Sequence, residues 1–197
     1  MRVPGVNIQV VAPSSGSSHH LQYVITTLVD DLIAIDAGAL GLLPLEAQRR
    51  VQHIFLSHAH LDHVATLPIF LDNVYEPGPQ CVNVYGTRDT LDVLQQSIFN
   101  DRVWPDMVRL SRGSTAFVRL IEIEPYQSVT VGGHTVTPLP LVHAIPTVAY
   151  VIDDWASAVA IVSDTEPSSA VWDALREQVR LKALFLECSF PDDMAEL

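Results

Sequence analysis

The chain has few cysteines, few basic residues and no long apolar run, and each of these shortages excludes a class of protein. Only Cys81 and Cys188 are present among 197 residues. A disulfide framework is therefore excluded, and a reducing cytoplasmic location is expected. No apolar stretch reaches the roughly 18 residues of a membrane span, and the first residues lack the apolar core of a secretory signal. We expect a cytoplasmic protein with no membrane partner.

Basic residues are outnumbered two to one, since 11 lysines and arginines face 23 acidic residues and the net charge is -12. Proteins that bind nucleic-acid polymers neutralise phosphates with clustered basic side chains. The charge balance therefore argues against a nucleic-acid polymer as partner. A small anionic substrate remains compatible, because a bound metal ion supplies positive charge locally. The oligomeric state is not indicated by the sequence.

The hydrophobic fraction of 48% and the charged fraction of 17% are typical of a folded chain, and we expect one domain over residues 1–197. Apolar patterning predicts strands at 7–12, 21–28, 31–38, 53–57, 81–86, 118–125, 148–153, 158–164 and 183–187, with a hairpin at 128–139. Helices are predicted at 44–52, at 62–75 with an interruption near Pro68, at 87–100 and at 168–180. The alternation predicts a layered α/β protein.

The stretch HIFLSHAHLDHV, residues 53–64, places His58, His60, Asp62 and His63 directly after a short apolar run. Imidazole nitrogens and carboxylate oxygens are ligands that zinc prefers. The His-x-His pair can direct two imidazoles toward one ion, and the adjacent Asp-His pair can serve a second ion. Alternatively these are surface residues, with Asp62 capping the next helix. The density of the cluster favours a paired-metal site.

Two more residues follow predicted strands, as ligands of a paired-metal site would. His143 comes after the run VTPLPLV, and Asp164 comes after AVAIVS. Taken singly, His143 could be a loop histidine and Asp164 a turn residue. Asp36, in AIDAG, occupies a similar position. We expect Asp36 to orient the histidine loop through hydrogen bonds instead of binding a metal directly.

Taken together, these residues resemble the metallo-β-lactamase superfamily over nearly the whole chain. The likeness is carried by Asp36, by His58-Ala59-His60-Leu61-Asp62-His63, by His143 and by Asp164, in that order. The resemblance implies an α/β fold of the αββα sandwich type, with metals at one edge. It further implies that His58, His60 and His143 hold one metal. Asp62 and His63 would hold the other, with Asp164 bridging the two.

Within that superfamily, the chain is most similar to the class II cyclic-nucleotide phosphodiesterases. This likeness is carried by the segments 56–75, 97–106, 147–153, 163–168 and 184–191, the last reading LFLECSFP. It implies hydrolysis of 3′,5′-cyclic AMP or cyclic GMP to the 5′-monophosphate by a metal-bound hydroxide. The cofactors would be two divalent ions, zinc first and manganese or iron as alternatives. Asp62 and Asp164 would be the catalytic carboxylates.

One departure from the superfamily pattern concerns the second metal. The pattern usually includes one more histidine downstream of the segment ECSFP, and no histidine follows His143 here. Either the C-terminal end of the fold is missing from this sequence, or the second site is incomplete.

The alternatives to a cyclic-nucleotide phosphodiesterase are a nuclease resembling the tRNA 3′-end enzymes, a thioester or lactone hydrolase, and a non-catalytic metal-binding relative. The acidic balance argues against the first, and six retained ligands argue against the last.

Overall fold

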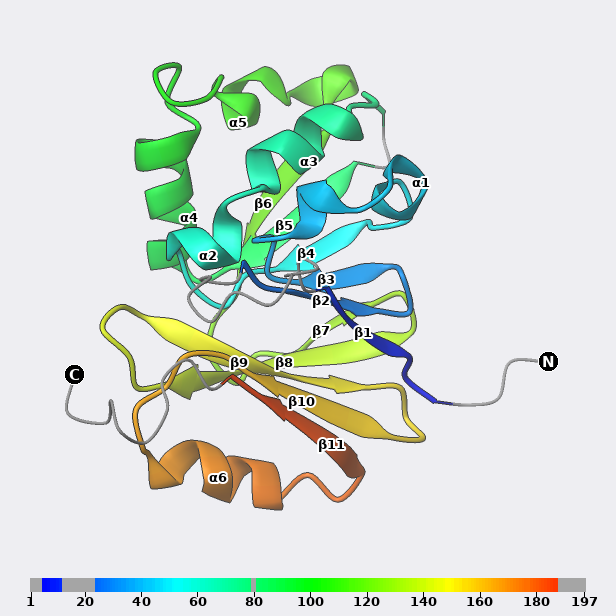
Figure 1. Ribbon diagram of the computed structural model, residues 1–197, viewed down its shortest axis with the longest axis vertical. Helices are drawn as coiled ribbons and strands as arrows, with labels where there is room; N and C mark the ends of the chain where they lie inside the picture. The colour runs from blue at the N-terminus through cyan, green and yellow to red at the C-terminus, as the bar shows by residue number, and fades with distance from the viewer. Residues whose placement is uncertain (1–4, 12–23, 79–80, 188–197) are drawn as a thin grey trace, which may run out of the picture. The chain divides into compact units, whose positions relative to one another are not determined.

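The computed structural model describes residues 5–11, 24–78 and 81–187, and the chain forms two compact units. The first unit runs from Asn7 to Glu124, and the second comprises Pro125–Leu197 together with Met1–Val6. Each unit contains one β-sheet and at least one helix (Figure 1). The predicted α/β class is confirmed by this mixture of sheets and helices. That residues 1–197 behave as one domain stays a prediction.

The first unit is built on a six-stranded sheet in the order β1-β2-β3-β4-β5-β6. Its strands are β1 (Ile8–Val11), β2 (Thr26–Val29), β3 (Ile33–Ile35), β4 (His53–Phe55), β5 (Val82–Gly86) and β6 (Val118–Glu122). β1, β2 and β3 pair antiparallel, whereas β3, β4, β5 and β6 pair parallel. Parallel strands end at a common edge of the sheet. The segments that follow β3 and β4 therefore start side by side.

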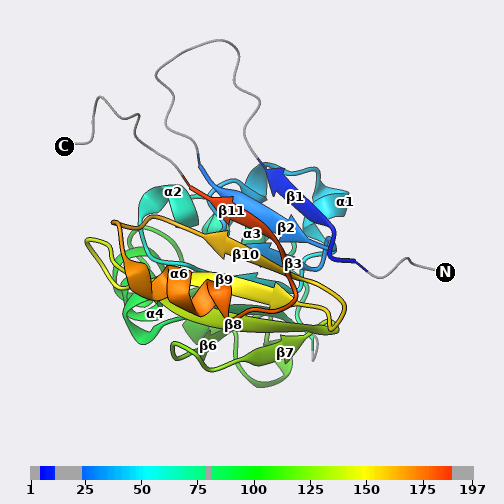
Figure 2. The same ribbon diagram turned by 90° about the horizontal axis from the view of Figure 1, so that it is seen from below.

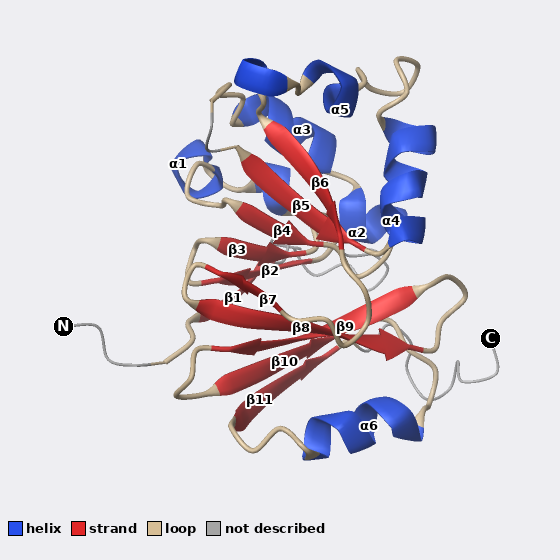
Figure 3. Ribbon diagram, turned by 180° about the vertical axis from the view of Figure 1, so that it is seen from behind, coloured by secondary structure: helices blue, strands red, loops and turns tan. Residues whose placement is uncertain are grey.

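Helices cover one face of this sheet (Figures 1 and 3). They are η1 (Leu40–Leu42), α1 (Leu45–Gln48), α2 (Leu61–Val64), α3 (Leu67–Asn73), α4 (Arg88–Val93), η2 (Leu94–Ile98), α5 (Met107–Leu110) and η3 (Gly113–Thr115). Ile54 of β4 and its neighbour Val84 of β5 are fully buried in one core cluster with Phe70 of α3. Because strand side chains alternate between faces, His53 and Asn83 point to the other face.

The second unit contains a five-stranded sheet in the order β11-β10-β9-β8-β7. Its strands are β7 (Val129–Val131), β8 (His134–Leu141), β9 (Thr147–Asp153), β10 (Ala158–Val162) and β11 (Leu181–Leu186). β7 to β10 pair antiparallel, and β11 joins β10 in parallel. Helix α6 (Ser169–Arg176) lies on one face (Figure 2), where Val171 and Leu175 pack into a core cluster with Val151 and Ala160.

The structure confirms most of the predicted elements and changes several boundaries. Thr87, the first residue of the predicted helix 87–100, caps α4, because its side chain accepts a hydrogen bond from the Thr90 amide. The predicted helix 62–75 is divided into α2 and α3, and Pro68 lies in the first turn of α3, where its missing N–H costs little. The predicted helix 44–52 is wrong beyond Gln48, because the Gln52 amide already donates to Leu32 at the start of the sheet.

The predicted hairpin at 128–139 is confirmed by the β7–β8 pairing, and Gly132 and Gly133 occupy its turn with φ of 57° and 85°. The strand pair predicted at 21–28 and 31–38 is confirmed as β2 and β3 within the residues that the structure describes. The beginning of the first of these, 21–23, lies outside the described residues. Among the described residues no helix is long and apolar enough to cross a membrane.

Candidate metal centre

The loop after β4 carries four of the predicted ligands within one short segment of the first unit. The Leu56 amide donates to the Tyr85 carbonyl of β5, so the chain is still held to the sheet one residue before the loop begins. His58 and His63 are completely buried, with 0% exposure of each. His60 is the N-cap of α2, and Asp62 and His63 lie within this single helical turn.

The ring nitrogens of His58 and His60 face each other. Nε2 of His58 lies 2.9 Å from Nδ1 of His60. Two nitrogens bound to one tetrahedral zinc at about 2.0–2.1 Å lie roughly 3.3 Å apart. The two imidazoles therefore have a spacing that a shared ion can accept after a small adjustment. This is the arrangement that the His-x-His pattern predicts.

Asp62 and His63 form a second pair of donor atoms on α2. Oδ2 of Asp62 lies 3.7 Å from Nε2 of His63, and the Asp62 side chain is 20% exposed. A carboxylate oxygen and an imidazole nitrogen at this separation are suited to one divalent ion. The partial exposure of Asp62 leaves its carboxylate accessible to water.

Backbone hydrogen bonds hold this short helix against the rest of the first unit. The carbonyl of Asp62 accepts from the Ile25 amide at 2.9 Å, and the carbonyl of His63 accepts from the Ala37 amide at 2.7 Å. A single helical turn satisfies few of its own carbonyls, so these external donors stabilise α2. These hydrogen bonds also fix the backbone positions of Asp62 and His63, from which the two side chains project.

Asp36 stands directly after β3 and orients the histidine loop, as its position in the sequence predicts. Its carboxylate accepts from the Ser57 amide at 2.7 Å, from the Ser57 hydroxyl at 2.8 Å and from Nδ1 of His63 at 2.8 Å. Its φ is 61°, a left-handed conformation that aspartate tolerates better than most residues. A metal-binding histidine commonly donates its other ring N–H to a carboxylate in this way.

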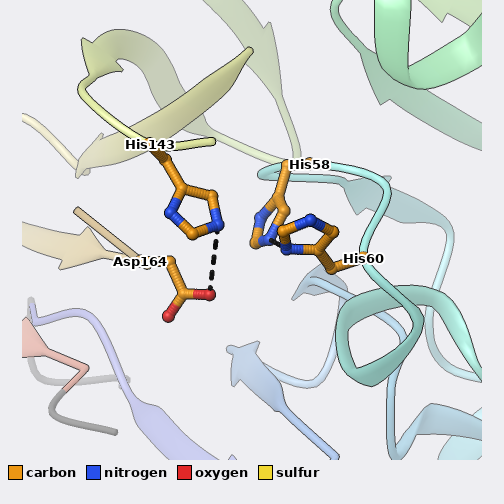
Figure 4. A group of neighbouring side chains, drawn as sticks. All are labelled: His58, His60, His143 and Asp164. Atoms are coloured by element: carbon orange, nitrogen blue, oxygen red, sulfur yellow. Dashed lines mark hydrogen bonds and ion pairs between the residues drawn. The ribbon is translucent and has the colours of Figure 1, made fainter. Parts of the chain in front are cut away.

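The second unit brings the other two predicted ligands together. β8 and β10 both run antiparallel to β9, so they end at the same edge of their sheet. His143 comes shortly after β8 and Asp164 shortly after β10. Nε2 of His143 lies 3.6 Å from Oδ2 of Asp164, and each side chain is 20% exposed. Figure 4 shows this ion pair and the hydrogen bond between His58 and His60 as dashed lines.

Glu187 follows β11 at that same edge, because β11 runs parallel to β10. Its amide donates to the Val162 carbonyl at 3.0 Å, and a carboxylate oxygen lies within 4.8 Å of one of Asp164. Sequence reasoning gave Glu187 no role of its own, and it gave none to Ser57. The predicted helix 168–180 between the strands 158–164 and 183–187 was the signal that could have found Glu187, because a helical crossover joins parallel strands. For Ser57 the signal was its position immediately before His58.

The residues present fit a divalent metal on the chemistry and spacing of their donor atoms. Donor atoms of two side chains lie close together in three pairs, each within one unit. The distances are 2.9 Å in His58–His60, 3.7 Å in Asp62–His63 and 3.6 Å in His143–Asp164. Imidazole and carboxylate together suit zinc, manganese and iron, and exclude none of the three. The buried Asp36 adds the hydrogen bonding that such ligands need. The structure therefore brings predicted ligands of the first unit close to one another, and does the same for His143 and Asp164 of the second unit.

The chain is similar to known cyclic-nucleotide phosphodiesterases. The model of the family described as "cAMP phosphodiesterases class-II" matches residues 42–197. A protein of Yersinia pestis named as a probable 3′,5′-cyclic-nucleotide phosphodiesterase is 32% identical over 164 residues. That match covers 76% of this chain and 46% of the relative. The chain spans about half the length of the relatives of this kind that it matches.

The fold of this chain is similar to that of several solved structures. The crystal structure of unliganded yeast PDE1 aligns with a TM-score of 0.72 at 19% identity, covering 96% of this chain and 77% of that one. The metallo-β-lactamase fold protein YhfI of Bacillus subtilis aligns with a TM-score of 0.65 at 20% identity, covering 95% of this chain and 73% of that one. These likenesses confirm the metallo-β-lactamase fold class that the sequence predicted.

Proposed function

Because the chain belongs to the class-II cAMP phosphodiesterase family, we propose that it hydrolyses 3′,5′-cyclic AMP or cyclic GMP to the 5′-monophosphate. One observation carries the proposal. The family match over residues 42–197 includes every predicted ligand, from His58 to Asp164. The same observation favours a phosphodiesterase over a thioester or lactone hydrolase, a tRNA 3′-end nuclease or a non-catalytic relative.

The proposed ligands follow the superfamily pattern. By that pattern His58, His60 and His143 would hold one divalent ion, Asp62 and His63 would hold a second, and Asp164 would serve both. The donor spacing supports two pairs within this assignment, since His58 faces His60 at 2.9 Å and His143 faces Asp164 at 3.6 Å. Zinc is the first candidate, with manganese and iron as alternatives. Metal content measured on the purified chain decides whether the second site is complete.

Bound divalent ions supply two things to such a reaction, a water whose pKa is lowered toward about 7 and positive charge at the phosphoryl oxygens. The remaining work belongs to side chains of this protein. Asp62, partly exposed on α2, orients the attacking water and accepts its proton. Water adds to phosphorus as the bond to the 3′ oxygen breaks, and the 3′ oxygen, which stays on the ribose as a hydroxyl, takes up the proton that Asp62 accepted. The phosphate stays on the 5′ oxygen.

The proposal also covers partner and location. A cyclic nucleotide is a small anion, and a chain with a net charge of -12 is compatible with it only where local positive charge is provided. The same balance supports the absence of a nucleic-acid polymer as partner. A content of two cysteines supports a cytoplasmic location. No membrane partner is part of the proposal.

The test is conversion of 3′,5′-cyclic AMP to 5′-AMP by the purified chain loaded with zinc or manganese. We expect metal-dependent product that is abolished in His58→Ala and retained in His53→Gln, which alters a histidine outside the proposed ligands. Cyclic GMP, a thioester and a lactone are assayed in parallel. Turnover of the thioester or lactone with no release of 5′-AMP or 5′-GMP would overturn the phosphodiesterase assignment.

A further inference from the structure

Ser57 connects Asp36 with the buried histidines of the candidate metal centre. It lies two residues after β4 and is 1% exposed. Its hydroxyl oxygen is 2.8 Å from Oδ2 of Asp36, 3.0 Å from Nδ1 of His58 and 3.4 Å from Nδ1 of His63. One small side chain therefore contacts a carboxylate and two proposed ligands at once.

The direction of these hydrogen bonds follows from counting protons. A carboxylate can only accept, and bonds to a charged acceptor are the stronger ones. The single hydroxyl proton of Ser57 is therefore donated to Asp36. Because the Ser57 hydroxyl has no second proton to donate, its oxygen accepts the hydrogen bond from His58. Nδ1 of His58 therefore carries the proton of the 3.0 Å bond. His63 needs no relay, because its Nδ1 donates directly to Asp36 at 2.8 Å.

The protonated nitrogen of a neutral imidazole determines where its lone pair lies. With hydrogen on Nδ1, both His58 and His63 present the lone pair on Nε2. Nε2 of His58 is the atom that faces His60 at 2.9 Å, and Nε2 of His63 is the atom that faces Asp62 at 3.7 Å. In each ring the lone pair therefore lies on the side where the other proposed ligand is.

We propose that Ser57 is a positioning residue that holds His58 in the Nδ1–H tautomer, so that Asp36 controls both buried histidines. Asp36 acts on His63 directly and on His58 through the Ser57 hydroxyl. The inference rests on the proposed function, because the metal centre is part of it. Its tests measure ring protonation and metal affinity without any substrate. A failure to hydrolyse cyclic nucleotides would therefore leave them unaffected.

The first experiment records long-range ¹H–¹⁵N spectra of the imidazoles in the metal-free chain near pH 8, where histidines are mostly neutral. In the unsubstituted protein we expect hydrogen on Nδ1 in both His58 and His63. In Ser57→Ala we expect His58 to move toward the Nε2–H tautomer while His63 keeps its proton on Nδ1. His63 is thus an internal control. A His58 that already carries its proton on Nε2 in the unsubstituted protein would overturn the proposal.

The second experiment measures zinc affinity by competition with a chromophoric chelator. Loss of an outer hydrogen bond to a metal ligand typically costs about 10–100-fold in affinity, and we expect Ser57→Ala to fall in this range and Ser57→Thr to recover most of it. Ser111→Ala is the matched control, since the Ser111 hydroxyl donates to Val118 and accepts from the amides of Phe117 and Val118. It should lower stability without changing zinc affinity. Equal affinity losses in Ser57→Ala and Ser111→Ala, or none in Ser57→Ala, would contradict the role of Ser57.

Discussion

Oδ2 of Asp36 lies 2.8 Å from Nδ1 of His63, although the two residues are 27 positions apart and both are almost completely buried. The parallel pairing of β3 and β4 brings them together, and the Asp36 amide donates to the Phe55 carbonyl at 2.9 Å. A buried carboxylate is costly unless it is well hydrogen-bonded. Asp36 meets that condition by accepting from Ser57 and His63, and in doing so it fixes the orientation of a proposed metal ligand.

Asp36→Asn tests this relationship without disturbing the backbone, because asparagine also tolerates a φ of 61°. The amide has one acceptor oxygen where the carboxylate has two, so at least one buried donor loses its partner. We expect the free energy of unfolding to fall by about 1–3 kcal/mol and zinc affinity to fall by about 10–100-fold. Urea unfolding and chelator competition measure the two effects.

Asp101→Asn is a control for this substitution. Asp101 also has a φ of 61°, but its carboxylate is exposed and accepts from the Asp106 amide and the Arg109 side chain, outside the metal loop. We expect unchanged zinc affinity in Asp101→Asn. An Asp36→Asn protein that binds zinc as tightly as Asp101→Asn would show that Asp36 does not orient the ligands.

Gly38→Ala should displace the helix that carries Asp62 and His63. A Cβ at position 38 would meet the Asp62 carbonyl oxygen at 1.7 Å and the Ile25 amide nitrogen at 2.6 Å, both of them backbone atoms. Such overpacking costs about 1–3 kcal/mol or more, and the shift of α2 should also weaken zinc binding. Gly78→Ala is the matched control, since no atom of the described residues is recorded within 4 Å of its added Cβ. Its stability should stay within about 0.5 kcal/mol of the original. Equal effects in the two variants would contradict the close packing at Gly38.

The proposed ligands in the loop after β4 could be grouped from sequence, because His58, His60, Asp62 and His63 lie within six positions that follow an apolar strand. The proximity of His143 and Asp164 was harder to predict, because it depends on β8 and β10 running in the same direction, and no local sequence pattern shows that direction. Ser57 escaped prediction for another reason. Its role comes from one hydroxyl lying between Asp36 and His58, and a serine beside a histidine has no distinctive pattern.

His53 should make stability depend on pH. Burial lowers its pKa below the usual value of about 6.5, and Asn83 and Tyr85 contact its Nδ1 at 3.4 and 3.5 Å. As the pH falls, the unfolded chain takes up a proton near pH 6.5 before the folded one does. This contribution to stability is therefore complete above about pH 6.5 and is lost as the pH falls toward the folded pKa.

His53→Gln removes this titration and gives the measurement. Urea unfolding near pH 7.5 and near pH 5 is compared for the two proteins, because the other histidines contribute equally to both. We expect a smaller loss of stability on acidification in His53→Gln than in the unsubstituted chain. An identical loss in the two proteins would mean that His53 is protonated equally easily when folded and unfolded.

If the ligand assignment taken from the superfamily pattern holds, zinc binding should couple His58 and His143. A ligand that binds only the folded state stabilises it by about 2.7 kcal/mol at a concentration 100 times its dissociation constant. If the two histidines hold the same ion, His58→Ala and His143→Ala should each remove most of the stabilisation that zinc gives. The double substitution should then remove little more, since the shared ion is already weakened by either change. Thermal unfolding of all four proteins with and without zinc measures this cycle. Strictly additive losses would assign the two histidines to separate ions, and the ligand assignment taken from the superfamily pattern would then be wrong even if the phosphodiesterase activity is present.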